Sequence, residues 1–311
     1  MTPIRTTAAA TAALGSLALG GAVLFGGYDP VEGLTDLMPT QFVEDVGGAE
    51  RINYAGKLRM LSQRIPAAAC NEAEGVAVAD ATAMLEAAVA EFDRIVAALE
   101  HGDEGLGILG PESDRKVLYD IQAMHAIWDP LHVDMDAMIA GDVDRGHAVH
   151  IAEMSPQLLD IAKHLVSVVV AEHSDPTAVL QADALTIDIA GRQRMLAQRI
   201  SKNACLAQAG MAEGALAEMA GAMEIYDVSM RALHGGLPEA GIQAPPTPAI
   251  AEGMTAIVAR WEAVTPLLER VQAGETLSVE ARGTVFAEMN ALTAEMNAVV
   301  GLYAEASKQG L

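Results

Sequence analysis

Two arginines, Arg59 and Arg194, occupy equivalent positions in a sequence segment that the chain contains twice. Residues 52–70 and 187–205 align at an offset of 135, with Ala-Gly, Arg-Met-Leu, Gln-Arg-Ile and a terminal Cys in register. A guanidinium stays charged at every accessible pH and donates paired hydrogen bonds, which suits a planar oxyanion. Two guanidiniums that face each other repel unless an anion lies between them. These residue types therefore indicate anion binding.

The rest of the chain is strongly acidic, so the positive charge of this repeated segment is unusual. The 311 residues carry a formal net charge of −23 and only 19 Lys and Arg residues. The windows 51–70 and 186–205 contain four basic residues each, namely Arg51, Lys57, Arg59, Arg64, Arg192, Arg194, Arg199 and Lys202. Because binding to nucleic acid or to anionic lipid requires basic patches, the overall charge argues against both as partners.

The internal repeat extends beyond this segment, and it determines the domain organisation that we expect. The chain has two tryptophans, Trp128 and Trp261, and they pair at an offset of 133. We therefore predict two modules of ordinary domain size, spanning 42–174 and 176–309. Apolar residues make up 51% of the chain but aromatic residues only 4%, and strand-like alternation is nearly absent. These features predict an all-α fold.

Clusters of glycine and proline divide each module into four helices. The predicted helices are 41–74, 78–101, 112–140 and 143–173 in the first module, and 177–209, 212–234, 247–273 and 278–308 in the second. Ser174-Asp175-Pro176 is typical of a helix start and is expected to open the second module. Four antiparallel helices with short connections form a bundle, so we predict two tandem antiparallel four-helix bundles.

The first helix of each module has two distinct faces. One face is an apolar stripe that should point into the bundle core, formed in the first copy by Tyr54, Leu58, Leu61 and Ile65. The other face carries small residues and one arginine, which indicates close contact with a second helix. The equivalent helix of the other copy is the obvious candidate. If the two helices pack in parallel about a pseudo-twofold axis, Arg59 and Arg194 face each other.

The two cysteines fit the same arrangement. Cys70 and Cys205 each lie eleven residues after the repeated arginine, at almost the same angular position on the helix. Parallel packing would therefore bring the two sulfurs together, and in an oxidising compartment they could form one disulfide. The alternative is that each cysteine is a small buried residue within its own bundle.

Residues 1–28 differ in character from the rest of the chain. Arg5 precedes an uncharged stretch, Thr6 to Tyr28, that is rich in Ala, Leu and Gly. This pattern is typical of a signal peptide or of a single membrane anchor, and residues 6–28 are long enough for a membrane tether. Because no clean cleavage site precedes Tyr28, we favour the anchor slightly. Either interpretation predicts that the body of the chain is exported.

The segment Ala55–Arg64, which reads Ala-Gly-x-x-Arg-Met-x-Ser-x-Arg, resembles the signature of the type IV pili methyl-accepting chemotaxis transducer N-terminal domain. It also resembles the P-box of nitrate/nitrite sensor kinases. The resemblance implies a four-helix sensor in the periplasm, or anchored in the inner membrane and facing the periplasm. In the nitrate sensors, the resemblance further implies, the arginine of the Arg-Met pair binds nitrate at the dimer interface, between the first helices of the two subunits. That role would fall on Arg59 and Arg194, with Gly56 and Gly191 as close-approach positions. Two copies in one chain would imitate the dimer.

The second copy departs from this signature. Ala197 stands where the first copy has Ser62, and Asp188 stands where it has Asn53. Asp188 adds a negative charge near Arg194, which should weaken an anion site. The chain also contains no recognisable kinase or signalling coiled coil, so we expect a protein partner for signal output.

Other patterns favour structural roles. The 16 methionines suit helical cores as gap-fillers. His147, His150 and Glu153 have ligand-like spacing, but no further ligand accompanies them, so we predict no metal site. Arg64 and Arg199 are expected to face solvent or to pair with acids. Because no arrangement of catalytic residues stands out, we predict no enzyme activity and no cofactor.

These observations predict an exported sensor or binding module. A small oxyanion, with nitrate or nitrite favoured, would bind between Arg59 and Arg194, and a partner protein would receive the signal. The alternative is a structural or interaction protein of a type IV pilus or chemoreceptor complex that binds no ligand.

Overall fold

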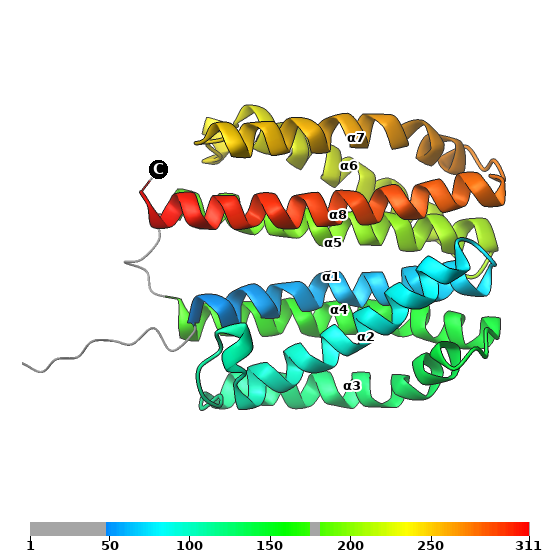
Figure 1. Ribbon diagram of the computed structural model, residues 1–311, viewed down its shortest axis with the longest axis horizontal. Helices are drawn as coiled ribbons and strands as arrows, with labels where there is room; N and C mark the ends of the chain where they lie inside the picture. Colours follow the sequence, from blue (N-terminus) through cyan, green and yellow to red (C-terminus); the bar gives the residue numbers. More distant parts are fainter. Residues whose placement is uncertain (1–47, 175–180, 311) are drawn as a thin grey trace, which may run out of the picture. The chain divides into compact units, whose positions relative to one another are not determined.

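The computed structural model describes residues 48–174 and 181–310. The candidate signal or anchor segment and the predicted start of the second module at Asp175-Pro176 lie outside the described residues. Within these two ranges the chain forms eight α-helices, two short 3-10 helices and no strand, with only two isolated β-bridges in loops. The all-α prediction is therefore confirmed (Figure 1).

The helices form two groups of four with the same order. The first group contains α1 (Gly48–Ala73), α2 (Val78–His101), α3 (Arg115–Ile139) and α4 (Arg145–His173). The second contains α5 (Gln181–Ala209), α6 (Ala215–Gly235), α7 (Pro248–Gln272) and α8 (Val279–Lys308). In the first group α1 packs against α2 and α4, and α3 packs against the same two helices; the second group repeats these contacts. Both groups belong to one compact unit, Asp45–Leu311.

Local sequence explains where these helices begin and end. The side chains of Asp114, Asp144, Thr247 and Ser278 accept hydrogen bonds from backbone N–H groups in the first turns of α3, α4, α7 and α8. After α2 and α6 the chain turns at Gly102 and Gly236, whose φ angles are 84° and 80°. Only glycine adopts this conformation at little cost. The equivalence of these caps explains why both copies fold alike.

The cores of the two bundles contain matching aromatic pairs. Trp128 stacks on Phe92 with ring centroids 3.9 Å apart, and Trp261 lies against Tyr226 at 4.6 Å. Three residues of the predicted apolar stripe of α1, Leu58, Leu61 and Ile65, are at most 1% exposed. The fourth, Tyr54, is only partly buried and packs against the edge of the core. The cores therefore leave the opposite faces of α1 and α5 for contact between the copies.

The two copies join through α1 and α5, which lie side by side and run in the same direction (Figure 1). Near the C-terminal ends of these helices a disulfide links Cys70 to Cys205, with the sulfurs 2.09 Å apart. Equivalent residues therefore face each other across this contact. None of the described helices combines the length and the apolarity that a membrane span requires.

Candidate functional site

The repeated arginines meet where α1 packs against α5. Arg59 Nη2 lies 3.5 Å from Asp188 Oδ1 on the facing helix, so its guanidinium has reached across from one copy to the other. The positive charge of Arg59 also acts on Arg194, since it is one of the causes that lower the pKa of Arg194. The structure therefore brings the two arginines within electrostatic reach, as parallel packing of the first helices requires.

Arg194 is a buried cation without an acidic partner among the described residues. The residue is only 5% exposed. Its guanidinium donates to the backbone oxygen of Gly191 at 3.3 Å and to Asn297 Oδ1 at 2.6 Å, and both acceptors are neutral. Burial, reinforced by the charge of Arg59, lowers the pKa of Arg194 to about 10. Burying this charge therefore costs free energy that the hydrogen bonds to two neutral acceptors do not offset.

Arg59 is less isolated because Asp188 accompanies it. Its side chain is 12% exposed, and burial lowers the pKa of Arg59 while the nearby carboxylate of Asp188 raises it. Asp188 is shared, since its other oxygen lies 2.5 Å from Arg192 Nη2 on the exposed side of α5. The side chain of Asp188 is 35% exposed. Among the described residues, one partly exposed carboxylate therefore contacts Arg59, and none contacts Arg194.

Gly56 and Gly191 play a different part from the expected close approach of another backbone. A Cβ atom added at Gly56 would meet only Arg59 Nη2, at 3.6 Å, and one added at Gly191 would meet only Arg194 Nη2, at 3.5 Å. Each guanidinium folds back over the glycine one turn before it, and each Nε donates to that glycine's carbonyl. The glycines thus leave a smooth surface on which the arginines lie.

Two further cations of the repeated windows, Arg64 and Lys202, were not selected from the sequence as site residues. Arg64 has a buried Nε with no hydrogen-bond partner in the described part of the chain, and burial lowers the pKa of Arg64. Arg64 is therefore only partly exposed and has no acidic partner among the described residues, whereas Arg199 does pair with Glu218. Lys202 is 7% exposed, and among the described residues its Nζ donates to Ser155 Oγ of α4 alone, at 3.1 Å. Burial lowers the pKa of Lys202 to about 8.

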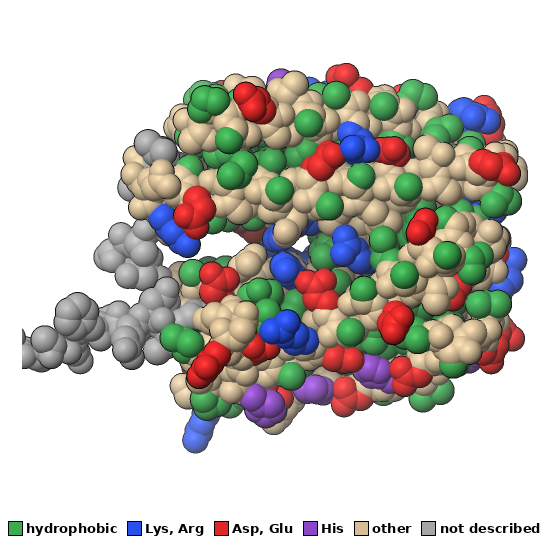
Figure 2. Space-filling view, viewed as in Figure 1, with side chains coloured by type: hydrophobic (Ala, Val, Ile, Leu, Met, Phe, Trp, Pro, Cys, Tyr) green, Lys and Arg blue, Asp and Glu red, His purple; other side chains and the backbone are tan. Residues whose placement is uncertain are grey.

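The sum of these charges is positive in a chain that is otherwise acidic. Arg59, Arg64, Arg194 and Lys202 are buried or partly buried, and only Arg59 contacts a carboxylate within the part of the chain that the structure describes. Figure 2 shows an opening between α8 and α1 with Lys and Arg side chains at its inner end. A small anion bound among these cations would relieve their mutual repulsion.

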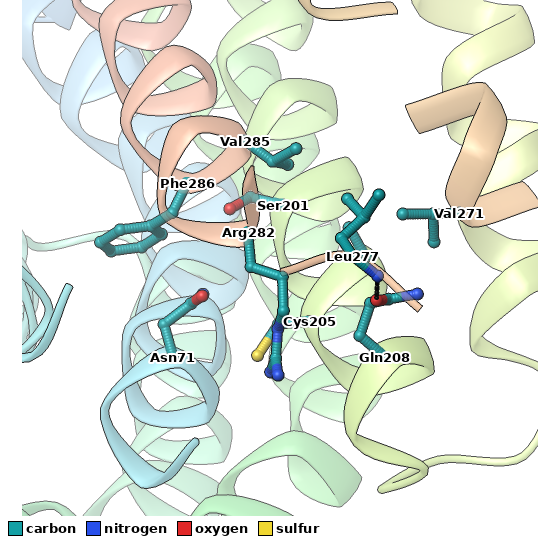
Figure 3. A pocket seen from close by; sticks show the side chains of 10 residues that line it. Asn71, Ser201, Cys205, Gln208, Val271, Leu277, Arg282, Val285 and Phe286 are labelled. Atoms are coloured by element: carbon teal, nitrogen blue, oxygen red, sulfur yellow. Dashed lines mark hydrogen bonds between the residues drawn. The ribbon is translucent and has the colours of Figure 1, made fainter. Parts of the chain in front are cut away.

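A second, very small cavity beside the disulfide does not qualify as a ligand site. It lies near Cys205 and Asn71, with Arg282 and Phe286 of α8 on another side, and Leu277 donates its backbone N–H to Gln208 at its edge (Figure 3). Its volume is about 10 Å³. This is roughly the space that one water molecule occupies.

The histidines considered as metal ligands make other contacts. His147 Nδ1 and His150 Nδ1 each lie 2.7 Å from one oxygen of Asp134. The hydrogen bond to Asp134 raises the pKa of His147. Across residues 48–174 and 181–310, no group of three or more His, Cys, Asp or Glu side chains is placed to hold a metal ion.

The sequence matches the family of type IV pili methyl-accepting chemotaxis transducer N-terminal domains, PilJ, twice, over residues 44–152 and 177–282. The chain belongs to this family. The two matches correspond to the two copies, and each reaches into the fourth helix of its bundle. No curated protein matches the chain.

Membership places the protein in a functional class. The family consists of sensory transducer modules of chemotaxis and type IV pili, not of enzymes, and its members are periplasmic sensor regions of membrane chemoreceptors. A transducer module works through a protein that receives its signal. The paired arginines therefore lie at the contact between two sensory repeats.

Proposed function

We propose that this protein is a periplasmic sensor that binds one small oxyanion between Arg59 and Arg194, with nitrate or nitrite favoured, and reports occupancy to a partner protein. In this proposal the modules span 42–174 and 176–309. Residues 6–28 either direct export or tether the chain to the inner membrane. The observation that carries the proposal is a buried arginine, Arg194, that has no acidic partner among the described residues and lies within electrostatic reach of a second arginine, Arg59.

A planar oxyanion matches this arrangement. Nitrate and nitrite are small, and they accept paired hydrogen bonds from guanidinium groups. A bound anion would replace the repulsion between Arg59 and Arg194 by two attractions in a partly desolvated contact, where charge interactions are stronger than in water. One anion per chain follows, since the site uses one arginine from each copy.

Asp188 acts in this proposal as an internal competitor for the site. Its carboxylate holds Arg59 at 3.5 Å, as an anion would. The first copy has the neutral Asn53 at the equivalent position, so this competitor exists on one side only. Because Asp188 is 35% exposed, it can swing toward solvent and toward Arg192 without leaving a charge buried. An entering anion would displace Asp188 and release Arg59 from it.

The disulfide determines what kind of movement this exchange can cause. Cys70 and Cys205 lie eleven residues beyond the arginines, which is roughly 16 Å along each helix. Since the disulfide ties α1 to α5 there, the two helices cannot slide past each other by a full turn. Anion binding would instead draw together the parts of α1 and α5 that precede the arginines. Small displacements of this kind are the usual output of switching proteins.

Thermal unfolding of the full chain tests the proposal. The protein is melted in a buffer without small anions, then with nitrate, nitrite or chloride at matched ionic strength. A ligand at about 100 times its dissociation constant stabilises the folded state by roughly 2.7 kcal/mol, which raises Tm by several degrees. We expect this increase with nitrate or nitrite, and we expect it to vanish in the double variant Arg59→Met, Arg194→Met.

Arg231→Met is the matched control, because Arg231 is an exposed arginine of α6 that pairs with Asp227. It should keep the full response to nitrate. If no oxyanion raises Tm in the unaltered protein, or if the double variant still responds, the anion-binding proposal is wrong. The first of these results would favour the ligand-free structural role in a pilus or chemoreceptor complex.

A further inference from the structure

The second copy contains a cavity at the start of α5 that is separate from the arginine site. Its volume is about 270 Å³. This is near the lower end of the range for small-molecule sites. Residues of α5, of the α6–α7 loop and of the end of α8 line it, namely Asp183, Thr186, Ile187, Gln243, Ala244, Pro246, Tyr303, Ala306 and Ser307. Thr186 precedes Arg194 by eight residues, which is roughly 12 Å along α5.

The first copy has a buried ionic network at the equivalent place. Arg51 is 3% exposed and donates to the backbone oxygens of Leu99 at 2.9 Å and Gly110 at 2.6 Å. Its guanidinium also lies 3.4 Å from Glu112 Oε2, and the same oxygen lies 2.8 Å from His173 Nε2. In the first copy, therefore, a guanidinium, a carboxylate and an imidazole fill this space.

The second copy has lost all three of these side chains. At the repeat offsets of its helices and loop, Thr186 replaces Arg51, Pro246 replaces Glu112 and Ser307 replaces His173. The three replacements are smaller than the originals and carry no charge. The cavity is thus the space that the guanidinium network occupies in the first copy.

The groups that remain around the cavity suit a cation. Asp183 is the charged side chain among the lining residues, and it has no ion pair within the described part of the chain. Ser307 Oγ is buried and has no hydrogen-bond partner there. Tyr303 presents an aromatic ring, and its hydroxyl lies 3.5 Å from the Leu233 carbonyl, the counterpart of the Leu99 carbonyl that accepts from Arg51. A carboxylate, a free hydroxyl and an aromatic ring together favour a cation over an anion.

We propose that this cavity binds a small organic cation, a guanidinium or ammonium group on a short apolar body. The charged group would lie near Asp183 and Ser307, in place of the missing Arg51 guanidinium. The apolar body would contact Ile187, Pro246 and the ring of Tyr303. This site goes beyond the anion site, differs from it in ligand charge, and exists in the second copy alone.

Binding of n-butylguanidinium to the full chain, measured by isothermal titration calorimetry, tests the proposal. n-Butylurea is the matched ligand, because it has nearly the same shape without the charge. We expect n-butylguanidinium to bind one per chain and n-butylurea to bind at least tenfold more weakly. Asp183→Asn should weaken binding of n-butylguanidinium at least tenfold. Glu305→Gln removes an equal charge from an exposed acid outside the lining and should leave affinity unchanged.

Thr186→Arg supplies the strongest test, since it returns to the second copy the guanidinium that Arg51 provides in the first. This variant should bind no n-butylguanidinium and should keep the response to nitrate. Circular dichroism establishes that it folds, and Asp183→Asn tests the cation independently if it does not. Equal affinity for n-butylurea, or undiminished binding to a folded Thr186→Arg variant, would overturn the proposal, as would the absence of any binding to the unaltered chain.

Discussion

Replacing Arg194 by methionine should make the anion-free protein more stable. Burial and the charge of Arg59 lower the pKa of Arg194 from its ordinary value to about 10. This change corresponds to about 3 kcal/mol of destabilisation of the charged side chain in the folded protein. Methionine removes that charge and fills a similar volume. Two hydrogen bonds are lost, a long one to the backbone oxygen of Gly191 at 3.3 Å and a shorter one to Asn297 Oδ1. Asn297 is exposed, so that water can satisfy its side chain, and the loss is worth about 1 kcal/mol.

The expected net gain is therefore about 2 kcal/mol, or an increase in Tm of roughly 4–8 °C for a domain of this size. The measurement is urea unfolding followed by circular dichroism, in a buffer whose anions are too large for the site. Urea is preferred because it is uncharged and does not screen the two arginines. The same variant should lose any stabilisation by nitrate. A gain in stability together with a loss of response is what a functional charge should give.

Arg51→Met provides the opposing control. Arg51 is buried to a similar degree, but its two Nη atoms contact Leu99, Gly110 and the carboxylate of Glu112, and only its Nε has no hydrogen-bond partner among the described residues. Breaking a buried ion pair from one side costs about 3–5 kcal/mol, because it leaves the partner charge unpaired. Arg51→Met should therefore lower the urea midpoint strongly, although the substitution is the same. If Arg194→Met destabilises the protein as Arg51→Met does, the argument that Arg194 carries an uncompensated charge is refuted.

Three other perturbations have definite expected outcomes. The pKa of Lys202 is about 8 in the folded protein and near its ordinary value when unfolded, so the unfolded state holds more protons above pH 8 and stability rises with pH. Relative to Lys202→Met, the unaltered protein should gain about 1.5 kcal/mol between pH 8 and 9.5 in urea titrations. A flat difference would contradict this. Asp188→Asn removes the internal competitor and should tighten nitrate binding about fivefold in calorimetry, equivalent to ~1 kcal/mol; weaker binding would disprove the competition. The double variant Cys70→Ser, Cys205→Ser opens a loop whose ends are 135 residues apart and should lower the free energy of unfolding by about 4–5 kcal/mol, whereas an unchanged urea midpoint would show that the disulfide does not stabilise the fold.

Much of the architecture could be predicted because the sequence contains an internal repeat. The offset between residues 52–70 and 187–205 implies two equivalent first helices. Their small-residue faces then imply that these helices pack against each other in parallel. Breakers such as Gly102 and Gly236 divide the helices, since their positive φ angles are incompatible with helix continuation. These features depend on local sequence and on periodicity, and both are properties of the sequence itself.

The contributions of Arg64 and Lys202 could not be predicted in the same way, and Asp188, expected near Arg194, contacts Arg59 of the other copy. Whether a lysine in an acidic chain finds a carboxylate depends on neighbouring helices, and Lys202 instead meets Ser155 of the other copy. The cavity in the second copy could not be predicted from the sequence pattern either. Its signal was the replacement of Arg51 by Thr186 at equivalent positions, which becomes informative only after Arg51 is seen in contact with Glu112. Non-local pairing, rather than helix propensity, separates what was predicted from what was not.

The disulfide-linked pair of α1 and α5 has a consequence for how such a sensor can evolve. In a homodimer with a shared site on its axis, every substitution appears twice and the site remains symmetric. Here each half can mutate alone, and the chain already differs between its halves at Asn53 and Asp188 and at Ala67 and Lys202. Fusion also removes any dependence of the site on protein concentration, because both halves are always present at a fixed effective concentration. A duplicated receptor can therefore adjust affinity on one side while the other side preserves the original contact.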